Sequence, residues 1–402
     1  MDTQTKRAGM IKTLSIPQSW RMPAFYFLHF FGVGVTLPFL NVYYYSMGIT
    51  VAQLGYLNAA ARFSTSLAPP LAGVLADRLR RGREILLVCV SLSSFVALGL
   101  WWSQGFWAFL ILITVYSASR GAVGPIAENA SLRQIEKSGG QYGRLRWWGS
   151  LGFIVAAMGV GRVIEAYSIG WMFPVLFGSG IILMFVVGTF PREWESGQSH
   201  FRRDLKKLLK TAPLHHFFGT AVLAAISAGP FGLYFSIYLR ELGMSAILIG
   251  LAWTIGVASE IFFLWYAHDI QKRIGLKAMI AMGIFALALR WEFTTWTTSI
   301  VALLGIQALH GVTFGIYHVG SVQFVDRMCG EAVKNTGQAL YTAATFGVGS
   351  TVGALLAGWL LPRFGFITLM HWGAALALIS GIWFVVSTKI PPEETAARSE
   401  SR

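Results

Sequence analysis

The sequence predicts an all-α integral membrane protein whose twelve transmembrane helices form two pseudo-symmetric six-helix halves. Three observations predict it: an apolar composition, twelve apolar runs of membrane-spanning length, and a regular alternation of charge in the connections. Of the 402 residues, 55% are hydrophobic and 12% are charged, and the mean hydropathy is +0.58. A soluble chain has about a quarter of its residues charged. Most of the surface is therefore expected to face lipid.

The apolar runs define the predicted spans. A helix needs about 20 mainly apolar residues to cross about 30 Å of hydrocarbon, and none of the runs has the ten-residue alternation of a membrane β-barrel. The predicted spans are 22–45, 51–76, 84–102, 106–129, 143–164, 168–190, 216–239, 247–267, 277–296, 299–322, 336–361 and 366–388.

The connections divide into two sets by charge. One set contains "DRLRRGREI", "LRQIEKSGGQYGRLR", "FRRDLKKLLK", "QKRIGLK" and "DRMCGEAVK", whereas "YYYSMGIT", "WWSQG" and "TTWTTS" are almost free of Lys and Arg. Basic loops stay in the cytoplasm, so both termini are predicted to be cytoplasmic in a cell's inner membrane. The N-terminal "MDTQTKRAGMIKTLSIPQSWRMP" is too polar for a signal peptide. The excess of 32 basic over 18 acidic residues thus reflects topology, and no nucleic-acid partner is expected.

The longest basic connection divides the chain into two repeats. Residues 191–215 separate a six-helix half at 1–190 from a second at 216–402, and their "FRRDLKKLLK" portion is predicted to be an amphipathic helix on the inner leaflet. "GVLADRLRRGREILL" follows the second span and "WYAHDIQKRIGLKAM" follows the eighth. Each places an aspartate, Asp77 or Asp269, at a helix end before basic residues. This arrangement is a parallel repeat of two halves.

The first of these segments carries a family resemblance. "GVLADRLRRGREI" resembles the loop motif Gly-x-x-x-Asp-Arg/Lys-x-Gly-Arg-Arg/Lys of the major facilitator superfamily of transporters. Gly73, Asp77, Arg78 and Arg81 match the motif, and Arg80 stands where the family usually has Gly. Gly73 is expected to allow close helix packing. In the family this cluster, with its counterpart in the repeat, stabilises the outward-facing state, so the resemblance implies that conformational role here.

Most of the chain also resembles the branch that contains the lactose and phenylpropionate permeases. The likeness rests on "PIAENASLRQIEKSGGQYGRLRWWGSLGF", "LHGVTFGIYH" and "GQALYTAATFGVGSTVGALLAGWL". It implies that Glu128 and Arg146, eighteen residues apart, bind substrate, and that Phe153 occupies the place where the lactose permease stacks a tryptophan on its sugar. Arg290 and His310 match an arginine and a histidine of that permease's proton machinery, next to the substrate.

Departures from that permease change the expected coupling. Thr313 stands where the permease has its proton-carrying glutamate, and "AAISAGPFGLYFSIYL" lacks its acidic pair on the seventh helix. Lactose is therefore not the expected substrate. Glu260, about thirteen residues into the eighth span, is the first candidate for the proton carrier because a carboxylate anion is costly there. Glu128 and His310 are further candidates, and a permanent pair between Glu260 and Arg290 is the structural alternative.

Position alone also pairs Glu128 with Arg146. The turn-like "SGG" at 138–140 lies beside their midpoint, so both would lie about 13 Å from the turn at a rise of about 1.5 Å per residue. A carboxylate offsets the cost of a buried arginine in lipid. The pair is predicted to face substrate, with a structural ion pair or snorkelling at the interface as the alternative. Arg144 is predicted to be an interfacial anchor.

Further polar residues within the spans favour an anionic substrate. His310 and His318 are eight residues apart and share a helix face, where they could relay protons or donate to an anion. Arg62 and Arg120 lie within spans, as do Arg146 and Arg290. The interior is therefore expected to carry more positive than negative charge. The small-residue patterns "GSLGFIVAAMGVG" and "GVGSTVGALLAG" are predicted to allow close helix packing.

The predicted function is secondary active transport, by proton-coupled uptake of a small organic solute such as phenylpropionate. A proton-driven exporter of drugs or metabolites, or a sugar or nucleoside symporter, is the alternative; the fifth helix lacks the Gly-Pro motif of many drug antiporters, which favours symport. The chain has no "GxxxxGK[ST]" segment, no nucleophile and base cluster, and no metal-ligand spacing among its 2 cysteines. No enzyme activity, cofactor or metal is expected. The expected partners are the solute, protons and lipid, and the expected state is monomeric.

Overall fold

The computed structural model describes residues 20–138, 142–190, 212–329 and 333–388. Within these ranges the side chains of Asp77, 128–138, 142–146, 212–213 and Asn335 are outside the description. The predicted amphipathic helix at 201–210 also lies outside the described residues. Nearly all described residues are helical, which confirms the all-α prediction.

The first group of helices follows the first six predicted spans within three residues, except that one helix extends nine residues further. It consists of α2 (Arg21–Ser46), α3 (Val51–Leu79), α4 (Gly82–Trp102), α5 (Phe106–Ser138), α6 (Tyr142–Ala166), the 3₁₀ turn η2 (Ile169–Trp171) and α7 (Met172–Gly188). Local sequence explains the boundaries of α3. The Thr50 side chain accepts a hydrogen bond from the Gln53 N–H, and the Gln53 side chain accepts one from the Thr50 N–H. At the other end Arg80 adopts a φ of 51°. This left-handed turn suits glycine best, and it is where the superfamily motif has glycine.

The second group of helices is less regular. It consists of α9 (Ala212–Ser227), α10 (Gly229–Glu241), α11 (Ala246–Thr295), α12 (Ile300–Ile306), η3 (Gln307–Leu309), η4 (Gly311–Ile316), α13 (Tyr317–Cys329), α14 (Lys334–Thr342), η5 (Ala343–Gly349) and α15 (Ser350–Ser387). The predicted seventh span is interrupted at Ala228, because Pro230 has no N–H to continue the helical ladder. Segments η4 and η5 are π-helical, which the sequence did not predict.

Two of these helices are broken by a glycine. Helix α11 has 50 residues, and a straight helix of that length would be about 75 Å long, more than twice the thickness of a bilayer core. Gly275 in α11 and Gly365 in α15 have φ values of 80° and 77°. Each of the two long helices therefore consists of two helices joined at its glycine.

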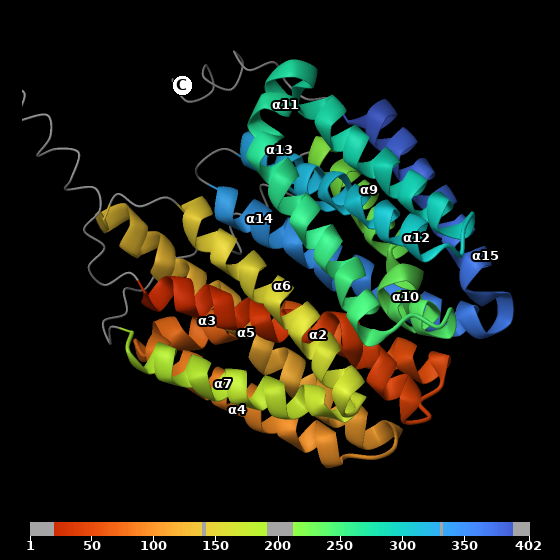
Figure 1. Ribbon diagram of the computed structural model, residues 1–402. Helices are drawn as coiled ribbons and strands as arrows, with labels where there is room; N and C mark the ends of the chain where they lie inside the picture. The colour runs from red at the N-terminus through yellow and green to blue at the C-terminus, as the bar shows by residue number, and fades with distance from the viewer. Residues whose placement is uncertain (1–19, 139–141, 191–211, 330–332, 389–402) are drawn as a thin grey trace, which may run out of the picture.

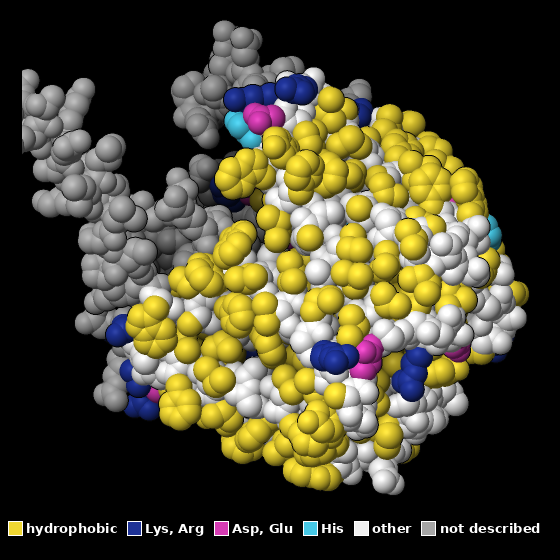
Figure 2. Space-filling view, viewed as in Figure 1, with side chains coloured by type: hydrophobic (Ala, Val, Ile, Leu, Met, Phe, Trp, Pro, Cys, Tyr) yellow, Lys and Arg dark blue, Asp and Glu magenta, His cyan; other side chains and the backbone are white. Residues whose placement is uncertain are grey.

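The described surface is suited to lipid. Among the described residues, nine helical segments are long and apolar enough to cross a membrane. Figure 2 shows hydrophobic side chains over most of the visible face, with charged side chains in a few small groups. Large exposed side chains include Trp265 (82% exposed), Phe185 (74%) and Trp107 (72%), which would be costly in water. The chain is a multi-pass membrane protein.

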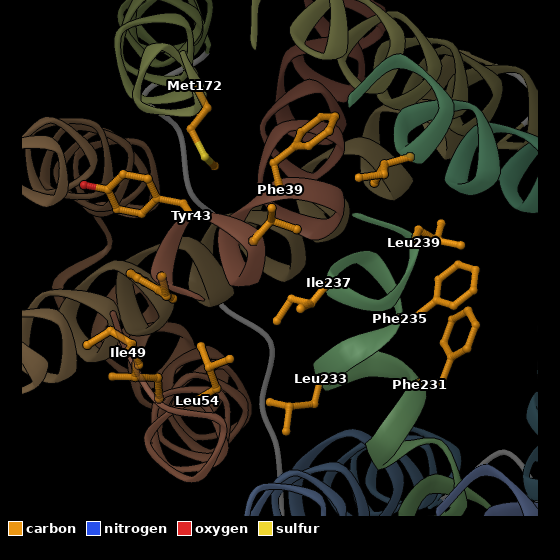
Figure 3. Packing of buried hydrophobic residues seen from close by; sticks show 14 of the residues in the cluster. Phe39, Tyr43, Ile49, Leu54, Met172, Phe231, Leu233, Phe235, Ile237 and Leu239 are labelled. Carbon is orange, nitrogen blue, oxygen red and sulfur yellow. The ribbon is translucent and has the colours of Figure 1, made fainter. Parts of the chain in front are cut away.

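The two helix groups lie side by side and share a core at one end only. Figure 1 shows α2 to α7 on one side of the molecule and α9 to α15 on the other. One buried cluster contains side chains from both groups, among them Phe39 and Leu54 from the first and Leu233 and Ile237 from the second (Figure 3). We call the end of the molecule that holds this cluster the closed end.

The other clusters each belong to one group. The cluster around Phe25 and Val90 is formed by α2, α4, α5 and α7, whereas that around Phe217 and Phe324 is formed by α9, α11, α13, α14 and α15. A smaller cluster around Met279 lies within the second group. Away from the closed end, the described residues therefore form separate cores.

Glycines allow the backbones of the two groups to touch at the closed end. A Cβ atom built on Gly55 would lie 2.7 Å from the Cα atom of Gly358, and one built on Gly161 would lie 2.9 Å from the carbonyl oxygen of Ala246. Real side chains do not approach so closely, so α3 against α15 and α6 against α11 require glycine. The predicted packing role of the two small-residue patterns is confirmed at these positions.

Polar contacts also join the groups at the closed end. The Asn41 amide donates to the Leu233 carbonyl oxygen at 3.0 Å, and the Tyr45 hydroxyl donates to Glu241 at 3.1 Å. The Glu165 carboxylate accepts a hydrogen bond from the Ile247 N–H at 2.9 Å. A carboxylate of one group thus caps the first turn of α11 in the other, where it also interacts favourably with the helix dipole.

The close packing expected at Gly73 is not seen among the described residues. A Cβ atom built on Gly73 would meet no atom of the described residues within 4 Å. Gly73 lies near the end of α3 that points away from the closed end, where the two groups have separate cores. The packing role of this glycine therefore stays a prediction.

We expect Gly161→Val to prevent closure at the closed end. Overpacking of a tight contact costs about 1–3 kcal/mol, so the ratio of closed to open molecules should fall about five- to 150-fold. The measurement is the distance between spin labels at Met47 and Thr298, in a background without native cysteines, which should shift to longer values. Gly159→Val is the matched control on the same helix, because a Cβ atom there meets no atom within 4 Å in the part of the chain that the structure describes. Equal distance distributions in the two variants would contradict the role of Gly161.

Candidate functional site

A central cavity of about 390 Å³ lies between the two helix groups. Its size is typical of a site for a small organic ligand. Helices α2, α3 and α6 of the first group and most elements of the second line it. Its described lining is mainly apolar and aromatic, and the charged and histidine side chains in it are Arg62, Glu260, Arg290, His310 and His318.

Arg290 is buried in the wall of this cavity, with 4% of its surface exposed. Its Nη2 donates to Gln307 Oε1 at 2.7 Å, and its Nη1 donates to His310 Nδ1 at 3.0 Å and contacts Thr313 Oγ1 at 3.4 Å. Its guanidinium carbon lies 4.6 Å from the centre of the Phe231 ring, a cation–π distance. These described partners are neutral, so none of them compensates the charge.

The contact with Arg290 fixes the tautomer of His310. Arginine has donors only, so His310 Nδ1 accepts and the ring proton lies on Nε2. Nε2 faces Glu260, whose Oε2 lies 4.0 Å away, and Glu260 is 8% exposed. Gln307, Arg290, His310 and Glu260 therefore form one polar chain along the cavity wall.

Glycines in "HGVTFG" bring the carboxylate and the imidazole together. A Cβ atom built on Gly311 would collide with the Ser259 carbonyl, and one on Gly315 would lie 3.4 Å from the Glu260 carbonyl oxygen. The Gly311 N–H donates to Ser259 Oγ at 3.0 Å. Segment η4 can therefore lie directly against α11 beside Glu260.

Two histidines and a phenylalanine form a stacked column on η4 and α13. The His310 and Phe314 rings are 5.4 Å apart, as are the Phe314 and His318 rings, with interplanar angles of 14° and 5°. All three line the cavity, as expected for positions that share a helix face. The column continues to Tyr341, whose ring is 6.2 Å from that of His318.

The remaining predicted substrate residues come from the first group. Phe153 on α6 is 4% exposed and lines the cavity, as does Arg62 on α3. Arg120 does not line it; this arginine donates to the carbonyl oxygen of His29 within the first group. The side chains of Glu128 and Arg146 lie outside the described residues, although their backbones belong to α5 and α6.

The predicted conformational residues lie away from the cavity. Arg78, Arg81 and Asp269 are exposed at helix ends opposite the closed end, and the Asp77 side chain is outside the described residues. No described contact joins this motif to its repeat. Its conformational role stays a prediction.

Sequence reasoning missed several residues of the cavity wall. Gln307, 1% exposed, holds Arg290, and Phe231, Trp253 and Trp291 supply aromatic surface. A signal for Gln307 was present, because it is a polar residue in the apolar run "IVALLGIQALH" and lies three positions before His310. The tryptophans gave no signal that distinguishes cavity from core.

The described residues show no metal centre. Among them, no group of three or more His, Cys, Asp and Glu side chains is placed to hold a metal ion. The arrangement can bind a small solute against aromatic rings and can hold a proton on Glu260 or His310.

Comparisons with known proteins identify the family and the fold. The model of the MFS_1 like family matches residues 19–380. The maltose permease of Geobacillus stearothermophilus is 27% identical over 347 residues, which cover 85% of this chain and 87% of the permease. A protein of Escherichia coli (strain K12) named "Probable 3-phenylpropionic acid transporter" is 23% identical over 349 residues, covering 85% and 90% of the two chains.

Among solved structures, the nucleoside transporter NupG has the same fold, with a TM-score of 0.83 and 17% identity over 92% of this chain and 99% of NupG. The family match covers most of the sequence. The chain therefore belongs to the MFS_1 like family of the major facilitator superfamily, and it is a secondary transporter.

Proposed function

We propose that the protein takes up a small organic anion, of the aromatic carboxylate class, together with a proton by alternating access. The observation that carries this proposal is the chain of Glu260, His310 and Arg290 in the wall of a cavity lined by both helix groups. A group that holds a proton and a group that attracts an anion are thus linked by one imidazole.

The proposed topology has twelve membrane-spanning helices in two halves, 1–190 and 216–402, joined by 191–215. Nine apolar segments support nine of these helices. The glycine breaks in α11 and α15 each divide one segment into two helices, which supports two more, and the less apolar α3 is the twelfth. We place both termini in the cytoplasm of a cell whose inner membrane holds the protein as a monomer. The basic segments then lie inside, and the closed end faces outside.

Binding of a proton to Glu260 and binding of an anion near Arg290 would each strengthen the other electrostatically. With Glu260 ionised, its negative charge lies beyond His310 and partly offsets that of Arg290. A proton on Glu260 removes that offset, so the buried guanidinium attracts an anion from the cavity more strongly. Couplings of this kind between sites are typically about 1–3 kcal/mol. The cavity would therefore bind the proton and the anion together or bind neither of them, as a symporter requires.

The lining of the cavity favours a substrate with a ring. The Trp253 Nε1–H donates to Ser236 at 2.9 Å, and that of Trp291 points to Ser227 at 3.4 Å. Both indole N–H groups are thus engaged within the protein, and Trp253 presents its carbon surface to the cavity. Phe153 offers another ring from the first group. We place Glu128 and Arg146 in the same site.

A neutral solute is the second candidate. The identity with the maltose permease and the fold of the nucleoside transporter NupG favour a sugar or nucleoside as substrate. Asn58, Gln307 and Ser350 supply uncharged polar groups in the cavity. An exporter is a third possibility, in which the proton gradient drives the solute the other way. No enzyme activity and no cofactor are part of any of these proposals.

Transport in proteoliposomes distinguishes the candidates. We expect an inside-alkaline pH gradient to drive accumulation of 3-phenylpropionate above the level in protein-free liposomes. One proton and one monovalent anion carry no net charge, so a potassium diffusion potential should leave the rate unchanged. Proton symport of uridine or maltose would instead be accelerated by an inside-negative potential. Accumulation of none of these solutes under either gradient would contradict proton-coupled uptake.

A further inference from the structure

Gln307 is the closest hydrogen-bond partner of the buried arginine in the cavity. It is 1% exposed, and its Oε1 accepts from Arg290 Nη2 at 2.7 Å. Its Nε2 donates to the Leu303 carbonyl oxygen at 3.0 Å, one helical turn away. Because oxygen and nitrogen both have partners, the amide has one orientation, with its oxygen toward the guanidinium.

The contact between Arg290 and Gln307 is unusual because Gln307 carries no charge. A buried arginine in a membrane protein is usually paired with a carboxylate, since that removes most of the cost of the buried charge. Glutamate has almost the same shape as glutamine and would fit the same contact. The other described partners of Arg290 are His310, Thr313 and the faces of Phe231 and Trp291, none of them acidic. Arg290 is therefore held firmly without being neutralised.

We propose that Gln307 sets the charge selectivity of the cavity, because it positions Arg290 and leaves its charge for an anionic group of the substrate. This inference rests on the proposed function in one respect, that the substrate is an anion. It assigns Gln307 a specificity role that a purely structural partner would not have. A carboxylate at the same position would occupy the arginine permanently and favour neutral solutes.

The test compares two probes that differ only in charge, 3-phenylpropionate and its neutral amide, 3-phenylpropanamide. Dissociation constants are measured on purified full-length protein at a pH where the acid is ionised. We expect wild-type protein to bind the acid at least tenfold more tightly than the amide. In Gln307→Glu that preference should fall to about one or reverse, while the affinity for the amide changes less than threefold.

Two further variants separate charge from structure. Gln307→Met removes the hydrogen bond without adding charge, so it should keep a preference for the acid even if both affinities fall. Thr313→Asp places a carboxylate near Arg290 from another position, since Thr313 Oγ1 lies 3.4 Å from Nη1. Thr313→Asp should abolish the preference for the acid over the amide. It serves as the test of charge if Gln307→Glu does not fold.

The outcomes distinguish a failure of the role of Gln307 from a failure of the anionic substrate class. A wild-type preference for the acid that survives in Gln307→Glu and Thr313→Asp overturns the role of Gln307 and leaves the proposed anion uptake intact. Loss of the preference in a folded Gln307→Met variant would show that selectivity depends on the position of the guanidinium rather than on the lack of charge at Gln307, which overturns the charge argument. A wild-type protein without any preference overturns both this inference and the anionic substrate class, while proton coupling is judged separately from transport under a pH gradient.

Discussion

Glu260→Gln is expected to abolish proton-driven accumulation while leaving exchange of substrate across the membrane. Glutamine preserves the shape of the side chain beside His310, but it cannot carry a proton at neutral pH. The link between a proton and the charge of Arg290 is then lost. We expect accumulation driven by a pH gradient to fall at least tenfold, which corresponds to about 1.4 kcal/mol of coupling.

The measurement uses two assays on the same proteoliposomes, uptake under a pH gradient and counterflow without one. Glu292→Gln is the matched control, because Glu292 lies in the second of the two helices of α11 and is paired with His371 at 3.0 Å, away from the cavity. It should retain both activities. If Glu260→Gln accumulates substrate as well as wild-type protein does, the proton is carried elsewhere, and Glu128 becomes the first candidate.

Arg290→Gln is expected to weaken binding of 3-phenylpropionate about ten- to 150-fold, because a charge-assisted contact to a buried guanidinium contributes about 1.5–3 kcal/mol. Binding of the neutral amide should change far less. Arg290→Lys should be intermediate, since a lysine ammonium keeps the charge but cannot reproduce the forked contact to Gln307 and His310.

Isothermal titration of purified protein measures both affinities, and thermal unfolding shows whether each variant is folded. Arg120→Gln is the matched control for a mid-span arginine outside the cavity. It should lower stability but change the affinity for the acid less than threefold. An Arg290→Gln variant that is folded and binds the acid as tightly as wild-type protein would remove Arg290 from the substrate site.

The helices could be predicted from the sequence because membrane length and loop charge leave few alternatives. The break at Ala228 was also readable in principle, since "AGPFG" places a glycine and a proline in the middle of a span. The π-helical segments were not, because "GVTFGI" and "AATFGVG" contain no local signal that distinguishes a π-helix from an α-helix. The separate cores opposite the closed end could not be predicted either, because one sequence serves several conformations of a transporter.

The candidate site was predicted in outline. The resemblance and the apolar context identified Arg290, His310 and Glu260, and the structure places all three along one wall of the cavity. Their pairing could not be derived, because the sequence is equally compatible with a direct pair between Glu260 and Arg290 and with a contact through the His310 imidazole. Here the glycines of η4 place His310 between the two charges. The neutral partner Gln307 was missed because a lone amide in an apolar run is usually a satisfied polar contact.

The distribution of the buried clusters has a practical consequence for stabilising this protein. Reopening at the closed end must separate the cluster shared by Phe39 and Leu233, while the clusters around Val90 and Phe324 can stay assembled. Substitutions that improve packing in the latter two should raise the melting temperature without trapping the transporter. Improved packing in the shared cluster should instead lock one state, which would suit structure determination and defeat transport assays.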